Sequence, residues 1–227
     1  MRKYSMLCRN SIAISALAFE MAMAASSGMG GPCASAGPSI TVATLNIGVK
    51  EANSMSSKKK FPEFRASLSA AIGQLLAAGV EVICLQEINK VWRDEAKKLC
   101  PPNWYMVQDD EWALCTLYAP TFTRVAAESV LIFPGSTSYK KAHRKVLRVD
   151  LRKVLAPTQD EADRVWSVWN NHTAIGDSTS GVSGDIRTFA LQALRAVAGH
   201  ALAAAQGKAR WNTVLCGDWN GKLTLKG

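Results

Sequence analysis

Histidine, metal-type cysteine spacings and long apolar runs are all scarce in this 227-residue chain. Its six cysteines are scattered without a C-x-x-C pair, which argues against a cysteine-bound zinc site. Cys84 and Cys216 lie inside short apolar runs, so we expect them to be small buried hydrophobic residues rather than disulfide partners. No apolar run reaches the length that a membrane-spanning helix needs. These absences favour a globular domain whose chemistry depends on oxygen and amide side chains.

Acidic residues are also few, at 18 against 27 lysines and arginines, which gives a formal net charge of +9. Such an excess favours a polyanionic partner, and we expect nucleic acid first and an anionic lipid headgroup second. The simpler alternative is that surface lysines and arginines only aid solubility.

The first 38 residues differ in composition from the rest. Three basic residues precede a modest apolar stretch from Ile12 to Phe19, and a tract rich in Ala, Ser and Gly then runs to Pro38. This pattern is typical of a weak signal peptide or an organelle-targeting leader. A plain disordered extension is the alternative, so the compartment stays open. We therefore expect residues 1–38 to be a leader or extension and residues 39–227 to form one domain.

Four short apolar runs each lead directly into polar residues of the kind that bind metal or phosphate. Ile40 to Leu45 precedes Asn46, Val82 to Gln86 precedes Glu87, Val165 to Trp169 precedes Asn170-Asn171-His172, and Val214 to Gly217 precedes Asp218-Trp219-Asn220. Runs of this length and composition predict buried strands. If the strands lie side by side with level ends, their polar side chains converge on one small volume. Amide, carboxylate and imidazole side chains gathered in this way are what a Mg²⁺-assisted phosphoesterase needs.

Strand and helix signals alternate along the remaining chain. A helix is predicted to begin at Pro62 and to stop before Gly79, because apolar residues recur between them at helical spacing. Two further helices are predicted from Lys90 to Lys98 and from Ile186 to Ala205. Strands are predicted over 112–118, 128–133 and 146–154. Because no helix separates these strands, we expect antiparallel pairing among them. Two packed sheets with helices outside make an α/β fold, a four-layer α/β/β/α sandwich, but the strand order does not follow from the pattern.

Taken together, four segments resemble the endonuclease/exonuclease/phosphatase superfamily, which has the DNase I-like fold. They are TVATLNIG (41–48), GVEVICLQEIN (79–89), VWSVWNNHT (165–173) and VLCGDWN (214–220). They occur in the family's order and cover about residues 39–220. The resemblance implies a metal-dependent phosphodiesterase or phosphomonoesterase.

The resemblance also implies a role for each polar residue at the metal. Glu87 would be the main protein ligand of Mg²⁺, with Mn²⁺ as the alternative ion, because such a hard cation prefers one or two carboxylates and keeps several waters. Asn46 would steady the metal or a metal-bound water through its amide oxygen. The simpler alternatives are a solvent-facing acid at a strand end and an Asn in a tight turn before Gly48.

The remaining site residues would act on the substrate. Asp218 would orient and deprotonate the attacking water, and Asn220 would donate from its amide to a phosphoryl oxygen. His172 would hydrogen-bond a phosphate oxygen, and Asn170 would fix the backbone or a carboxylate beside it. The alternatives are that Gly-Asp-Trp-Asn is only a turn and that His172 is a structural histidine.

The chain departs from the family pattern after Asn220. The family ordinarily carries an Asp-His pair near its C-terminus, after two more strands, and this chain ends at Gly227 without one. We therefore expect a truncated version of a longer enzyme, incomplete at the C-terminus, with weak or absent catalysis.

Within the family, Gly48 stands where abasic-site enzymes have an acidic residue, which argues against that substrate. We expect a nuclease first, with a lipid or inositol-phosphate phosphodiesterase as the alternative. A non-catalytic basic remnant that binds nucleic acid is the third hypothesis.

Overall fold

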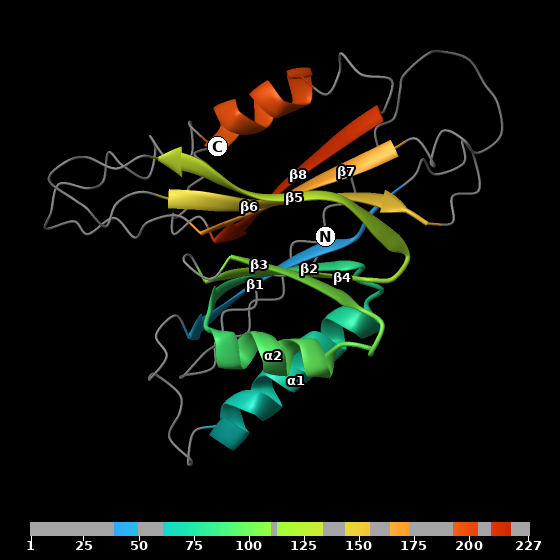
Figure 1. Ribbon diagram of the computed structural model, residues 1–227. Coiled ribbons are helices and arrows are strands. Elements are labelled where there is room, and N and C mark those ends of the chain that lie inside the picture. The colour runs from blue at the N-terminus through green and yellow to red at the C-terminus, as the bar shows by residue number, and fades with distance from the viewer. Residues whose placement is uncertain are drawn as a thin grey trace, which may run out of the picture.

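The computed structural model describes residues 39–49, 61–109, 113–133, 144–154, 164–172, 193–203 and 210–218. Two four-stranded sheets pack face to face, and helices lie on the outer face of each sheet (Figure 1). This is the four-layer α/β/β/α arrangement predicted from the sequence. The leader predicted for residues 1–38 lies outside the described residues.

The first sheet has the strand order β1-β2-β4-β3. Its strands are β1 (Val42–Val49), β2 (Val82–Ile88), β4 (Leu114–Tyr118) and β3 (Tyr105–Asp109). β1 and β2 are parallel, whereas β4 is antiparallel to both of its neighbours. The prediction for 112–118 is thus confirmed as β4, whereas β3 was not singled out in the sequence.

The second sheet has the order β5-β6-β7-β8. Its strands are β5 (Phe122–Phe133), β6 (Arg144–Lys153), β7 (Arg164–His172) and β8 (Arg210–Asp218). β5 and β6 pair antiparallel, as predicted, whereas β4 belongs to the first sheet and does not pair with β5. β6 also pairs antiparallel with β7, and β7 pairs with β8 in parallel. β5 begins earlier than the predicted start at residue 128, because residues 122–124 and 126–127 also pair with β6, with a register shift at Val125.

Helices α1 (Phe61–Ala77) and α2 (Lys90–Leu99) cover the outer face of the first sheet. α1 buries the predicted apolar stripe, and the chain turns at Gly79, whose φ of +73° favours glycine. α2 begins at Asn89, whose side-chain oxygen accepts a hydrogen bond from the Trp92 N–H. A helix over residues 193–203 covers the second sheet (Figure 1), and the rest of the predicted helix lies outside the described residues. In the described part, no helix is both long and apolar enough to cross a membrane.

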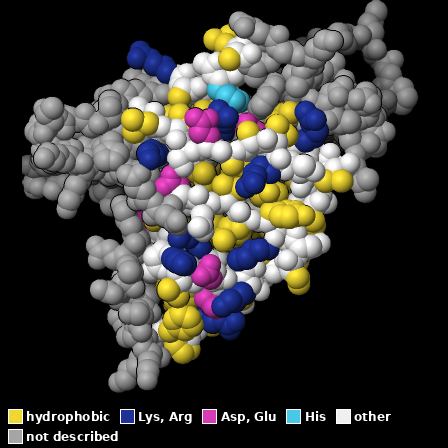
Figure 2. All heavy atoms as spheres, in the orientation of Figure 1, with side chains coloured by type: hydrophobic (Ala, Val, Ile, Leu, Met, Phe, Trp, Pro, Cys, Tyr) yellow, Lys and Arg dark blue, Asp and Glu magenta, His cyan; other side chains and the backbone are white. Residues whose placement is uncertain are grey.

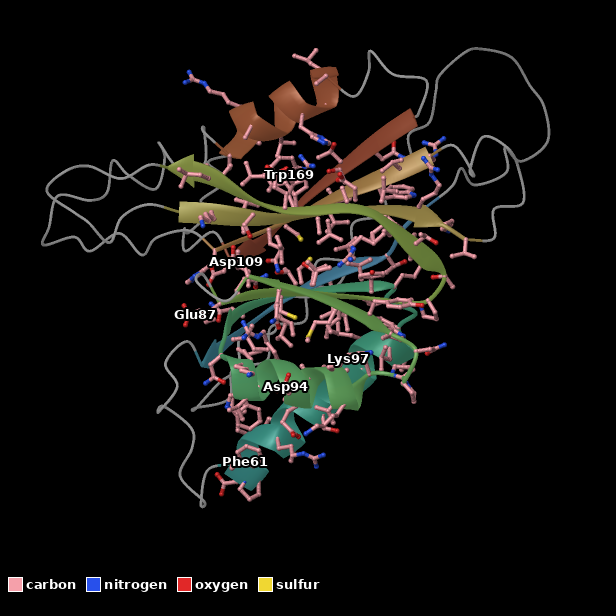
Figure 3. All side chains as sticks on the ribbon, viewed as in Figure 1. Phe61, Glu87, Asp94, Lys97, Asp109 and Trp169 are labelled. Carbon is pink, nitrogen blue, oxygen red and sulfur yellow. The ribbon has the colours of Figure 1, made fainter. Side chains whose placement is uncertain are left out.

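Apolar side chains fill the three spaces between the four layers. Trp92 packs between the first sheet and its helices, Val168 lies between the two sheets, and Trp169 packs under the helix over 193–203 (Figure 3). Neighbouring residues of β7 therefore serve different layers, because side chains alternate across a strand. Cys84 and Cys216 both lie on the inter-sheet side as free thiols, and Cys84 is fully buried.

Candidate active site

The two parallel strand pairs end at the same edge of the sandwich. β1 packs near β8, and β2 contacts both β7 and β8 across the space between the sheets. His172 and Asp218 are the last residues of β7 and β8 and are paired in register. The side chains that follow the apolar runs therefore share one edge.

Two contacts cross from one sheet to the other at this edge. The Asn46 amide Nδ2 donates to Asp218 Oδ2 at 2.6 Å, and His172 Nε2 lies 2.9 Å from Glu87 Oε1. The His172–Glu87 contact is short, but it lacks the alignment of a well-formed hydrogen bond, and it becomes an ion pair only when the imidazole is protonated. The structure thus brings Asn46, Glu87, His172 and Asp218 together. Asn220 lies outside the described residues.

A β-bulge places the Asn46 side chain. Asn46 pairs with Gln86, but the next pair is Val49 with Ile88, so β1 has one residue more than β2 at this point. Gly48 takes a φ of +67°, and its N–H donates to Asn46 Oδ1 at 2.9 Å. The sequence analysis expected Asn46 at the end of its strand, but the strand continues to Val49. The bulge aims Asn46 at the second sheet, where it reaches Asp218.

Glu87 has an unusual backbone conformation, with a φ of +52° inside β2. A non-glycine residue in this region costs about 1–3 kcal/mol and persists only where its surroundings hold it there. The following N–H, of Ile88, is anchored by a 3.1 Å hydrogen bond to the Ala113 carbonyl. Strain of this kind clusters at functional sites, and here it falls on the predicted metal ligand.

Gly217 allows β8 to approach β7 closely. Its φ is +134°, and a Cβ at this position would lie 2.7 Å from the carbonyl carbon of Asn171 and 2.8 Å from its nitrogen. Only glycine fits such an approach to a backbone. The glycine before Asp218 is therefore what lets that carboxylate lie level with His172.

Asn170 is fully buried and binds backbone rather than a carboxylate. Its Nδ2 donates to the carbonyls of Leu85 at 3.2 Å and Cys115 at 3.0 Å, and its Oδ1 accepts from Gln86 Nε2 at 2.7 Å. This matches one of the two roles expected for Asn170, the fixing of backbone. Gln86 was not singled out in the sequence analysis, although a glutamine inside an otherwise apolar run is a visible signal.

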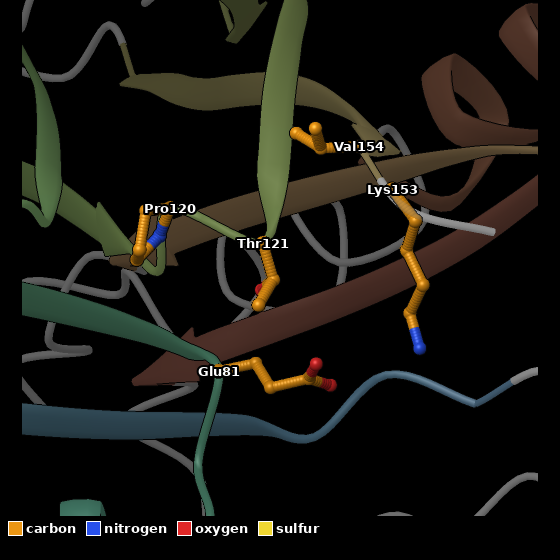
Figure 4. Close-up of a pocket in the computed structure, with 5 residues that line it drawn as sticks. All are labelled: Glu81, Pro120, Thr121, Lys153 and Val154. Atoms are coloured by element: carbon orange, nitrogen blue, oxygen red, sulfur yellow. The ribbon is translucent and has the colours of Figure 1, made fainter.

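The opposite end of the sandwich is a separate region. A hollow of about 270 Å³ lies there, lined by Glu81, Pro120, Thr121, Lys153 and Val154 (Figure 4). The carboxylate of Glu81 accepts a hydrogen bond from the Thr41 N–H at 3.1 Å, before β1 begins. None of the predicted site residues lines this hollow.

The donor set at the site suits a hydrated hard cation. Glu87 and Asp218 supply carboxylates, and Asn46 Oδ1 has a second lone pair beyond the one that accepts from Gly48. Within the described ranges, no three His, Cys, Asp or Glu side chains gather into a metal cage. Mg²⁺ does not need such a cage, because it binds through one or two carboxylates and keeps several waters.

Neither a protein-family model nor a curated protein matches this sequence. Solved structures do match its fold. The human Nocturnin catalytic domain with bound sulfate anion is 15% identical, with a TM-score of 0.55 over 82% of this chain and 65% of that chain. Truncated Caenorhabditis elegans TDP2 is 13% identical, with a TM-score of 0.52 over 78% and 60%. A humanized D. rerio TDP2 is 14% identical, with a TM-score of 0.51 over 81% and 63%.

Nocturnin and TDP2 are members of the endonuclease/exonuclease/phosphatase superfamily. The comparison confirms the predicted fold: this chain has the DNase I-like sandwich. The matched region spans 60–65% of those three chains.

Proposed function

Because the chain has a DNase I-like fold, we propose that it is a Mg²⁺-dependent phosphoesterase that hydrolyses phosphodiester bonds in nucleic acid by in-line attack of water. The observation that supports this proposal is the meeting of Asn46 with Asp218 and of Glu87 with His172 at one edge of the sandwich. These four residues come from four strands, and two contacts between the sheets join them. Such a convergence of carboxylates, amide and imidazole serves no evident purpose in packing.

Glu87 and Asn46 are the proposed metal-holding residues, with Mg²⁺ as the ion and Mn²⁺ as the alternative. The ion, when bound, would offset negative charge on the phosphate and on its leaving oxygen. The positive φ of Glu87 supports this role, because strained backbone clusters at functional sites.

Asp218 is the proposed acceptor of a proton from the attacking water. The Asn46 amide holds Asp218 Oδ2 at 2.6 Å, so the carboxylate is oriented before substrate binds. In the proposed step the water oxygen bonds to phosphorus, the bond to the leaving oxygen breaks, and the proton of the water passes to Asp218. No covalent enzyme intermediate forms.

His172 and Asn220 are the proposed donors to phosphoryl oxygens. The contact with Glu87 keeps the imidazole at the site, with 9% of its side chain exposed. Asn170 supports this arrangement through backbone rather than by touching substrate. The part assigned to Asn220 stays a prediction.

Nucleic acid is the proposed substrate because the formal net charge of +9 suits a polyphosphate backbone. On the face seen in Figure 2, lysines and arginines are spread among acidic and apolar side chains rather than gathered in one stripe. Contacts to phosphate from dispersed side chains would favour binding without sequence preference.

The test is hydrolysis of labelled single-stranded DNA, duplex DNA and RNA by the full chain, with Mg²⁺ and with EDTA. We expect EDTA-sensitive cleavage that falls by about 10²–10⁴ in Asp218→Asn. Asp94→Asn is the matched control, because Asp94 is exposed on α2, away from this edge (Figure 3).

Cleavage that persists unchanged in Asp218→Asn would overturn the proposal. Salt-sensitive binding of nucleic acid without cleavage would favour the basic remnant instead. Hydrolysis of inositol-phosphate headgroups in anionic vesicles, with nucleic acid left intact, would favour the lipid alternative.

A further inference from the structure

A chain of three polar side chains, two of them fully buried, runs beneath the candidate active site. Thr44 Oγ1 donates to Gln86 Oε1 at 3.1 Å, and Gln86 Nε2 donates to Asn170 Oδ1 at 2.7 Å. Gln86 and Asn170 have no exposed surface. This polar ladder, formed by Thr44, Gln86 and Asn170, joins β1 and β2 of the first sheet to β7 of the second.

The direction of every bond in the polar ladder is fixed. Asn170 must present its NH₂ group to the carbonyls of Leu85 and Cys115, because carbonyl oxygens can only accept. The side-chain oxygen of Asn170 therefore faces Gln86, and Gln86 must donate to it from its own NH₂ group. Gln86 also donates to the Cys84 carbonyl at 3.0 Å, which leaves its oxygen to accept from Thr44. A fully satisfied buried network of this kind specifies one geometry.

The polar ladder lies next to the reacting groups along both strands. Gln86 directly precedes Glu87, and Asn170 lies two residues before His172 on the same face of β7. The 2.7 Å bond between the two amides therefore sets the spacing of the sheets just below the Glu87–His172 contact. The same bond fixes Gln86, the residue before Glu87 with its strained φ. The residue after Glu87, Ile88, is fixed by its hydrogen bond to the Ala113 carbonyl.

We infer that Gln86 is a positioning residue that, through Asn170, holds Glu87 against His172 across the two sheets. The inference rests on the proposed function in so far as this pair belongs to the active site. Gln86 itself touches neither substrate nor metal, since it is wholly enclosed. A shift of about 1 Å at such a site costs about 10²-fold in rate.

The first test replaces Gln86 with methionine, which keeps the length of the side chain and removes its hydrogen bonds. We expect kcat to fall by about 10- to 100-fold while KM stays within about twofold, because alignment is lost and binding is kept. Thr44→Val breaks only the outer bond, and we expect a smaller fall in the same direction. This milder variant keeps the test decisive if Gln86→Met does not fold.

Ser167→Ala is the matched control. Ser167 is fully buried on β7, donates to Asp150 Oδ1 at 2.7 Å and accepts from Trp169 Nε1 at 2.9 Å, but it faces the outer side of the sheet. We expect a lower unfolding midpoint with kcat unchanged. If Gln86→Met and Ser167→Ala lower kcat equally at similar stability, the inference is wrong, because general loosening would then explain the effect.

A second readout does not depend on activity. The chain has three histidines, so ¹⁵N-histidine labelling gives three pairs of ring-nitrogen signals, and the pair that is lost in His172→Gln belongs to His172. We expect the His172 ring nitrogens to shift in Gln86→Met and to stay in place in Ser167→Ala. If the wild-type chain is inactive but its His172 signals shift in Gln86→Met, the proposed function is wrong and the inference is supported. If the wild-type chain is active but Gln86→Met changes neither kcat nor the His172 signals, the inference is wrong and the proposed function is unaffected.

Discussion

Replacing Gly217 with alanine tests the geometry on which the site depends. The added Cβ would meet the carbonyl carbon of Asn171 at 2.7 Å and its nitrogen at 2.8 Å. The first distance is about 1 Å inside the usual carbon–carbon contact of about 3.5–4.0 Å. Both atoms belong to the backbone of β7, so no side-chain rotation relieves the overlap, and β8 must move away.

The expected cost has two parts. Overpacking against a rigid neighbour costs about 1–3 kcal/mol, and a φ of +134° at a residue with a Cβ costs about 1–3 kcal/mol more. The free energy of unfolding should therefore fall by about 2–6 kcal/mol, which corresponds to roughly 4–24 °C in Tm for a domain of this size. Activity should fall further than the loss of folded protein explains, because Asp218 moves with β8.

Urea denaturation followed by circular dichroism measures this loss, and Gly73→Ala is the control. Gly73 lies on the exposed side of α1 with nothing within 4 Å of an added Cβ, so alanine there should stabilise by about 1 kcal/mol. If Gly217→Ala unfolds within about 0.5 kcal/mol of wild type, β8 does not approach β7 as closely as described, and the placement of Asp218 fails with it.

Three further results are expected. Asp218→Asn should lower kcat by about 10²–10⁴ with little change in urea midpoint, and equal losses of both would contradict a catalytic role. Glu87→Asn should abolish Mg²⁺-dependent turnover. The free energy of unfolding should stay the same or rise by up to about 1 kcal/mol, because Asn tolerates a φ of +52° better than Glu does. A marked loss of stability would refute the strain argument. Burial, and then the charge of Arg148, lower the pKa of His200, so the unfolded chain binds more protons and stability should fall as pH drops below about 6.5. His200→Phe should flatten this acid limb between pH 7 and 5.5 in urea titrations, and an unchanged limb would assign it to other groups.

Local patterns in the sequence were enough to predict most elements of the fold, although β3 and the first half of β5 were missed. The apolar stripe of α1 recurs at helical spacing and is buried as expected, and Gly79 follows the helix with a positive φ. β7 and β8 end at His172 and Asp218, among the polar residues that directly follow the predicted apolar runs. These features depend on residues close together in the chain, which is why the pattern alone was sufficient.

The details of the site depend on contacts between distant residues and could not be predicted in this way. The bulge at Asn46 exists only in relation to the register of β2, and the φ of Glu87 has no signature in the residues beside it. Gln86 lay within a run interpreted as apolar, and its importance depends on Asn170, 84 residues further along the chain. A polar residue inside a buried strand is therefore a reason to look for a partner on the opposite sheet.

The position of the site and the layered architecture have the same origin. Parallel neighbours need a crossover connection, and α1 supplies it between β1 and β2, while the helix over 193–203 lies between β7 and β8 in the chain. Each crossover helix must cover the outer face of its own sheet, so the inner faces are left to pack against each other. The carboxyl ends of both parallel pairs then meet at one edge, where Asn46 reaches Asp218 and Glu87 reaches His172. A candidate site made from both sheets is thus a consequence of placing one parallel pair in each.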